Sequence, residues 1–203
     1  MKIKNKSLID SFIGGIMGFK EDILEFNPFN EQEEMDKKWI IDFMEKYDDV
    51  LTRENIVAHF TVSNWVVNKD RTKILMIHHN IYNSWGWTGG HSDGDSDFRH
   101  VALKELEEES GIKNAKILTD KFVSLELVTV NGHVKKGKYV SPHIHINVTY
   151  LVEADENEVL KVKADENSGV KWVNIDDVYT VTNEPKMVPI YKKLNEKLKM
   201  LGV

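Results

Sequence analysis

The sequence predicts an α/β protein in which helices cover both faces of a mixed β-sheet. Residues 7–50 place apolar side chains three and four positions apart, which is the spacing of amphipathic helices. From about residue 55 the chain changes to runs of β-branched and aromatic residues, which are typical of strands. A clear helix interrupts these strands and another ends the chain, so the predicted sheet has helices available for both of its faces.

The first 54 residues are expected to form a helical extension that packs on a core domain over residues 55–203. The residues Asn27-Pro28-Phe29-Asn30 separate two helical segments, and Asn30 is a candidate N-cap for the second. The apolar repeats are Ile9, Phe12, Ile13 and Ile16 in the first segment and Trp39, Ile40, Phe43 and Met44 in the second.

The core domain is expected to begin with a β-hairpin over residues 58–78, because two strand-like runs flank the turn residues 68–71. A glycine-rich loop over residues 85–95 then leads into a helix over residues 97–110. The remaining predicted elements are strands over 121–130, 141–152 and 169–174 and a closing helix over 184–201.

The composition excludes several kinds of chemistry. Among the 203 residues there is no cysteine, so disulfides, thiolate metal sites and cysteine nucleophiles are ruled out. The formal net charge of −6 disfavours bulk nucleic-acid binding. No apolar run reaches the roughly 18 residues of a membrane span, and Asp10 interrupts the stretch after the basic N-terminus. We therefore expect a protein that works in the cytoplasm and not in a membrane.

The candidate chemistry lies in the predicted helix that follows the glycine-rich loop. Glu105, Glu108 and Glu109 stand three and four positions apart and share one helix face, whereas Glu107 points away. That face is also apolar, so these like charges must be protonated or neutralised. Three carboxylates offer the hard oxygen ligands that Mg²⁺ and Mn²⁺ prefer. The alternative is an acidic face that is simply solvated.

The spacing of this segment resembles the Nudix box, G-x5-E-x7-R-E-U-x-E-E-x-G-U, where U is a bulky aliphatic residue. The matching residues are Gly90, Glu105, Leu106, Glu108, Glu109, Gly111 and Ile112. Two positions depart, since Ser96 replaces the first glutamate and Lys104 replaces the arginine. Lysine keeps the positive charge but loses the two-pronged hydrogen bonding of arginine. The departures therefore bear on the rate of reaction rather than on the fold or the metal site.

The resemblance implies a Nudix-like α/β/α sandwich and a pyrophosphohydrolase that cleaves the diphosphate linkage of a nucleoside diphosphate derivative. It implies that Glu105, Glu108 and Glu109 bind Mg²⁺, with Mn²⁺ as the alternative ion. Glu105, or a later carboxylate such as Glu166, would position or deprotonate the attacking water, and Lys104 would hold Glu105 in place. The implied partner is a small-molecule nucleotide or phospho-anhydride substrate, and the formation of a homodimer is left open.

Two glycines and three histidines are the candidate substrate-binding residues. Gly89 and Gly90 would let the backbone approach a ligand closely, and His91 follows them directly. His143 and His145 alternate with apolar residues on a predicted strand, which in this fold would run beside the substrate cleft. Such an H-x-H pair can also bind a transition metal, although polar-face histidines without any ligand are the more common case.

Other classes of function are alternatives to a Nudix pyrophosphohydrolase. The departures at Ser96 and Lys104 suit a catalytically weak or inactive Nudix-fold module that binds or senses nucleotides, although the retained glutamates argue against it. The isomerase branch of the fold, which acts on isoprenoid diphosphates, is expected to use a cysteine that this chain lacks. A histidine-metal oxygenase is the most remote alternative.

Overall fold

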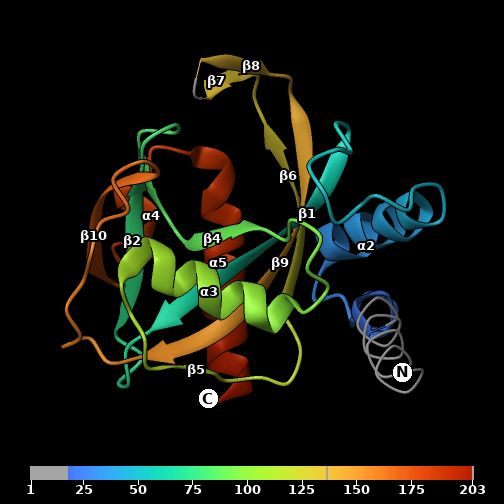
Figure 1. Cartoon of the computed structure of the whole chain (residues 1–203). Coiled ribbons are helices and arrows are strands. Elements are labelled where there is room, and N and C mark those ends of the chain that lie inside the picture. The colour runs from blue at the N-terminus through green and yellow to red at the C-terminus, as the bar shows by residue number, and fades with distance from the viewer. Residues whose placement is uncertain (1–17, 136, 203) are drawn as a thin grey trace, which may run out of the picture.

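The computed structural model describes residues 18–135 and 137–202 (Figure 1). The apolar repeat predicted from Ile9 to Ile16 therefore lies outside the described residues. Residues 18–25 are helical, which places a helix at the end of that first predicted segment. Within the described ranges, every helix is too short or too polar to cross a lipid bilayer.

The described elements follow the order that the sequence predicts, with strands, then one helix, then more strands and closing helices after the N-terminal helices. The helices are α2 (Glu31–Met44), α3 (Phe98–Ser110), α4 (Val178–Val181) and α5 (Val188–Leu201), with a short 3₁₀ helix at Pro185–Met187. The strands are β1 (Ala58–Val67), β2 (Lys73–His79), β3 (Ser84–Gly86), β4 (Thr88–His91), β5 (Ala115–Ile117), β6 (Ser124–Val130), β7 (His133–Lys135), β8 (Lys138–Val140), β9 (His143–Ala154) and β10 (Asn167–Asn174).

A mixed sheet forms the centre of the fold. Its main path runs β10-β2-β1-β9-β5, with β3, β4 and β6 pairing beside it, while β7 and β8 form a separate hairpin. The central strands β1 and β9 are parallel, from the pair Ala58–Ile144 to the pair Val67–Glu153. The other pairs in this sheet are antiparallel, so the predicted mixed sheet is confirmed.

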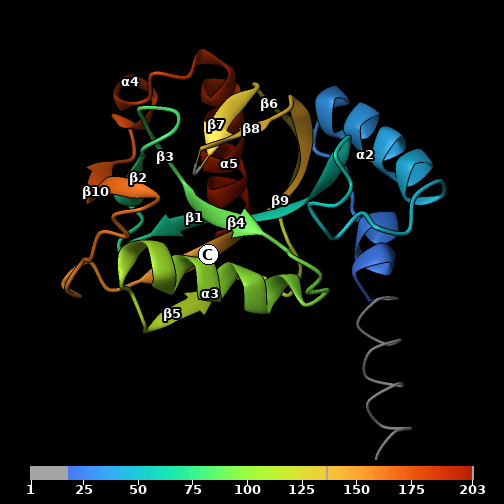
Figure 2. The ribbon, with the colours of Figure 1, turned by 45° about the horizontal axis from the view of Figure 1, so that its top comes forward.

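Helices α3 and α5 lie on opposite sides of this sheet (Figures 1 and 2). Successive side chains of β1 point to opposite faces, so one strand contributes to two cores. Phe60 and Val62 belong to the apolar cluster that includes α3, whereas Trp65 belongs to the cluster that includes α5. This layered α/β/α arrangement confirms the fold predicted from the sequence.

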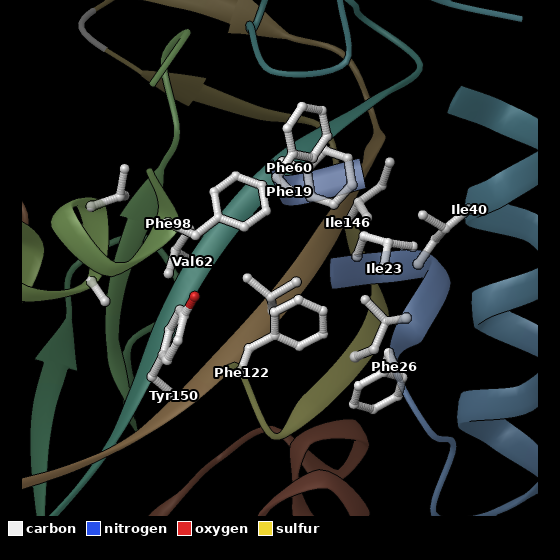
Figure 3. Packing of buried hydrophobic residues seen from close by; sticks show 14 of the residues in the cluster. Phe19, Ile23, Phe26, Ile40, Phe60, Val62, Phe98, Phe122, Ile146 and Tyr150 are labelled. Atoms are coloured by element: carbon white, nitrogen blue, oxygen red, sulfur yellow. The ribbon is translucent and has the colours of Figure 1, made fainter. Parts of the chain in front are cut away.

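The described part of the N-terminal extension packs into the same core as the central strands. Phe19, Ile23 and Ile40 are buried in the same apolar cluster as Phe60, and the ring centroids of Phe19 and Phe60 lie 5.5 Å apart (Figure 3). Burial of such side chains is the main source of folding free energy. The division of the chain between residues 54 and 55 stays a prediction from the sequence.

A buried ion pair also ties the extension to the end of the chain. Asn30 caps α2, as predicted, by accepting a hydrogen bond of 3.0 Å from the backbone N–H of Glu33. The buried Glu33 carboxylate lies 2.9 Å from Nζ of Lys193 and 2.6 Å from Nζ of Lys197, both on α5. Burial raises the pKa of Glu33, but the two ammonium groups more than reverse this and hold that pKa below its ordinary value.

The glycine-rich segment differs from the sequence expectation. The predicted loop over residues 85–95 contains β4 and most of β3. Strand β4 pairs with β1, so that Gly89 lies opposite Ser63 and His91 lies opposite Thr61. Its sequence, Thr-Gly-Gly-His, has no β-branched or aromatic run because the backbone, rather than side-chain packing, forms this strand.

Candidate active site

Helix α3 is fixed at both ends by local interactions. The Asp97 side chain accepts a 3.1 Å hydrogen bond from the backbone N–H of His100, which satisfies a donor of the first turn. Gly111 ends the helix with φ at 80°, a left-handed conformation that glycine adopts without strain. These two caps determine where the helix begins and ends, and so they help to set the direction in which each glutamate of the helix points.

The acidic residues of α3 divide between two faces as the sequence predicts. Glu105 and Glu109 are buried, with 8% and 2% of their surface exposed. Glu108 is more exposed and lies beside Lys163, with 2.8 Å between the carboxylate and Nζ. Glu107 faces outward, where its carboxylate lies 3.7 Å from Nζ of Lys113. Glu107 therefore has no place in the acidic face of the site.

The two glycines of β4 make room for the buried carboxylates. The backbone N–H of Gly89 donates a 2.8 Å hydrogen bond to Oε2 of Glu109. A Cβ atom on Gly90 would lie 2.4 Å from the carboxylate carbon of Glu105, far inside van der Waals contact. The observed position of the Glu105 carboxylate thus requires glycine at residue 90, whatever further contact this residue makes with a substrate.

Burial and neighbouring charges give the glutamates different pKa values. Burial raises the pKa of Glu105 and raises the pKa of Glu109 to about 8. The hydrogen bond from Lys163 lowers the pKa of Glu108 instead. A buried carboxylate next to two others is electrostatically costly without a cation. Carboxylate oxygens are the hard ligands that Mg²⁺ and Mn²⁺ prefer, so these glutamates have the chemistry of a divalent-ion site.

The other two predicted catalytic residues lie beside this carboxylate cluster. Nζ of Lys104 is 3.3 Å from Oε1 of Glu105 and 3.8 Å from Oε1 of Glu108. Glu166 lies across from the helix, where its carboxylate is 2.9 Å from the same Lys163 that contacts Glu108. Lys104 therefore contacts the carboxylate cluster directly, and Glu166 is linked to it through Lys163.

A single cleft of about 570 Å³ joins the predicted site residues. Its lining includes Glu105, Glu108, Glu109, Lys104, Glu166, Gly89, Gly90, His91, His143 and His145. Clefts of roughly 300–1,000 Å³ are the usual size for small-molecule sites. The structure therefore brings together residues that are up to 77 positions apart in the sequence, from Gly89 to Glu166.

The cleft is also lined by His59, which is not among the site residues predicted from the sequence. His59 lies opposite His145 in the parallel pairing of β1 with β9, and its ring stacks on that of His143 at 5.0 Å between centroids. The sequence holds one indication of this, because His59, Thr61 and Ser63 occupy alternate positions of β1 and therefore share a polar face of the strand. The partner strand and its register cannot be derived from that alternation.

The fold and the cleft together define an α/β enzyme with an acidic site of nucleotide size. The family model of the NUDIX domain matches residues 57–198, and the chain therefore belongs to the Nudix family. It is a Nudix hydrolase acting on phosphoric anhydrides, as the spacing of the glutamates and glycines predicted.

A curated relative and several solved structures are similar to this chain. The RNA pyrophosphohydrolase of Pelagibacter ubique is 30% identical over 139 residues, which cover 66% of this chain and 87% of that protein. The Ap4A hydrolase of C. elegans aligns with a TM-score of 0.52 and 19% identity over 69% of this chain and 97% of that chain. The NUDIX domain of Shewanella oneidensis NrtR, complexed with ADP ribose, aligns with a TM-score of 0.52 and 17% identity over 77% of this chain and 97% of that chain. At these identities the structural likeness shows the fold alone.

Proposed function

We propose that this protein is a Mg²⁺-dependent hydrolase that cleaves the diphosphate linkage of a nucleoside diphosphate derivative. The observation that carries the proposal is the buried carboxylate of Glu109, held beside Glu105 and Glu108 in a cleft of nucleotide size. A diphosphate linkage brings several negative charges into such a cleft, so the reaction needs a positive counter-charge there.

The carboxylates of Glu105, Glu108 and Glu109 would hold the ion, with Mn²⁺ as the alternative to Mg²⁺. When bound, the ion supplies positive charge to the phosphate oxygens and lowers the pKa of a coordinated water. The backbone N–H of Gly89 donates a 2.8 Å hydrogen bond to the carboxylate of Glu109 and so orients it, which supports its role as a ligand.

Glu105 is the first candidate for positioning or deprotonating the attacking water. It is buried, it faces the cleft, and the ammonium group of Lys104 lies 3.3 Å from Oε1. Lys104 would thus act as a positioning residue for Glu105. Glu166 is the second candidate base, because it lines the same cleft from the strand side near Lys163.

The substrate would lie along the cleft, between the carboxylates and the histidines. Gly89 and Gly90 would admit its phosphates close to the backbone, and His91, His143 and His145, which line the same cleft, would also contact it. The similar proteins are named for RNA, for Ap4A and for a complex with ADP ribose, each of which contains phosphoric anhydride or phosphate ester groups. The net charge of −6 favours a small nucleotide over a polymer. A cytoplasmic location stays a prediction from the sequence.

A product screen tests the proposal. The protein is incubated with Mg²⁺ and a panel of ADP-ribose, dinucleoside polyphosphates, nucleotide sugars, nucleoside triphosphates and 5′-triphosphorylated RNA. We expect at least one small nucleotide to be split at its anhydride, with no product in EDTA or with the Glu109→Gln variant. Splitting that persists in EDTA would contradict the metal dependence. Binding of a nucleotide without any cleavage would favour the weak or inactive binding module.

A further inference from the structure

Four histidines from three strands meet in the cleft. They are His59 on β1, His91 on β4, and His143 and His145 on β9. One ring nitrogen from each can be chosen so that all of these atoms lie within 4.8 Å of one another. The Nε2 atom of His145 lies 3.2 Å from that of His91 and 3.1 Å from that of His143.

Hydrogen bonds on the far side of two rings determine where their lone pairs point. Nδ1 of His59 lies 2.9 Å from the carbonyl oxygen of Asn55, and Nδ1 of His143 lies 2.8 Å from that of Ser141. A carbonyl oxygen can only accept, so both Nδ1 atoms must carry the hydrogen. In the neutral ring each Nε2 then carries a free lone pair, and that of His143 lies 3.1 Å from Nε2 of His145. Metal-binding histidines are oriented by this same kind of hydrogen bond.

The cluster does not satisfy itself by hydrogen bonding. Nε2 of His59 is buried and has no hydrogen-bond partner among the described residues. Nε2 of His145 can donate one hydrogen at most, so it cannot serve both His91 and His143 as a donor. Buried polar atoms without partners are rare in native proteins, and a missing ion is a common explanation.

We propose that His59, His91, His143 and His145 bind a first-row transition-metal ion, with Zn²⁺ as the preferred occupant. Zn²⁺ takes imidazole nitrogens at about 2.0–2.1 Å, so the edges of a tetrahedral site measure about 3.3–3.4 Å. The two Nε2 separations of 3.1 and 3.2 Å are close to that value. Burial also lowers the pKa of His91 and of His145, which keeps the rings in the neutral form that binds metals.

This site is chemically distinct from the glutamate cluster that lines the same cleft. An all-nitrogen ligand set disfavours Mg²⁺, which binds oxygen, whereas imidazole suits Zn²⁺ and its neighbours in the first row. The same cleft would therefore hold two ions of different kinds. The histidine-bound ion would also link β1, β4 and β9, because each of these strands contributes a ligand.

Metal content and a cobalt spectrum test the proposal on the full-length protein. After chelator treatment and dialysis, Co²⁺ is added and the visible d–d bands are recorded, and Zn²⁺ is then titrated in. We expect bands of four-coordinate nitrogen-bound Co²⁺ that Zn²⁺ abolishes at about one ion per chain. Zn²⁺ should also raise the melting temperature, because it binds the folded state alone.

Variants separate this site from other histidines and from the carboxylates. His145→Ala and, independently, His91→Asn should lose the cobalt bands and the zinc-dependent rise in melting temperature. His100→Ala changes an exposed histidine on α3 outside the cleft and should keep both signals. Glu108→Gln/Glu109→Gln should also keep them. Cobalt bands that survive in both cluster variants, or a parent protein that retains no Zn²⁺, would overturn the proposal.

Discussion

Gly90 on β4 lies so close to the carboxylate of Glu105 on α3 that a side chain at residue 90 would overlap it. A Cβ atom on Gly90 would meet all the carboxylate atoms of Glu105, with the shortest separation at 2.4 Å. The obstructed group is the far end of a side chain, so an alanine at this position would displace the carboxylate and leave the backbone in place. The glycine therefore determines where a candidate ligand and base can lie.

Gly90→Ala is expected to reduce activity much more than stability. Displacing a catalytic group by about 1 Å can cost on the order of 10²-fold in rate, whereas the melting temperature should change by only a few degrees. Gly89→Ala is the matched comparison, because its Cβ would lie 2.4 Å from the backbone oxygen of Val62. That variant should melt clearly lower. Steady-state rates and thermal melts of both variants check this prediction. If the two variants lost the same activity and the same melting temperature, Gly90 would not act by positioning the Glu105 carboxylate.

Glu105→Gln and Glu107→Gln are expected to differ widely in effect. Loss of a general base or of a residue that fixes the reactive water costs on the order of 10²–10⁴-fold. Glu107 points to solvent and contacts Lys113, so its variant should stay within a few-fold of the parent. The measurement is kcat/KM on whichever substrate the product screen identifies. Equal losses would mean that the helix face does not define the site.

Lys104→Arg should preserve the fold and raise turnover. Lys104 contacts Glu105 and Glu108 through a single ammonium group at 3.3 and 3.8 Å. A guanidinium can donate two parallel hydrogen bonds to one carboxylate and should fix Glu105 more firmly. Lys104→Gln, which removes the charge, should lower kcat. Turnover that falls in the arginine variant with an unchanged melting temperature would count against a positioning role for Lys104.

Glu33→Gln should destabilise the protein strongly at neutral pH. Removing one partner of a buried ion pair costs about 3–5 kcal/mol, which corresponds to roughly 6–20 °C in melting temperature for a chain of this size. Because Lys193 and Lys197 lower the folded-state pKa of Glu33 below 4.5, its contribution is present above about pH 4.5. That contribution is lost as the pH falls through the folded-state pKa.

Denaturant unfolding of parent and variant across this pH range checks the ion pair. The difference in unfolding free energy should be large at pH 7 and should shrink in acid. Glu34→Gln, on the exposed face of the same helix, is the control and should have little effect. A constant difference at every pH would show that Glu33 acts through packing rather than through its charge.

The acidic helix could be predicted from sequence because its information is local. Glu105, Glu108 and Glu109 lie within five residues, and the caps at Asp97 and Gly111 are close by. Helical periodicity alone then assigns the face that each glutamate takes. The same is true of the cap at Asn30, which depends on atoms three residues apart.

The histidine cluster and the buried ion pair could not be predicted in this way. His59 and His145 become neighbours only through the parallel pairing of β1 with β9, whose register no local pattern specifies. Glu33 and Lys197 meet across most of the chain, and each looks like an ordinary surface residue in the sequence. The strand at Thr88–His91 was missed because backbone pairing, not side-chain pattern, creates it.

Thermal melts in EDTA and in Mg²⁺ show whether the glutamates form a divalent site. Saturating a folded-state site at about 100 times its Kd adds about 2.7 kcal/mol, so Mg²⁺ should raise the melting temperature of the parent by roughly 5–10 °C. Glu109→Gln replaces a buried carboxyl group, whose pKa burial raises to about 8, with a neutral amide of the same shape, so in EDTA the variant should melt no lower than the parent and should not respond to Mg²⁺. A parent that is indifferent to Mg²⁺, together with a Glu109→Gln variant that melts clearly lower in EDTA, would contradict the account.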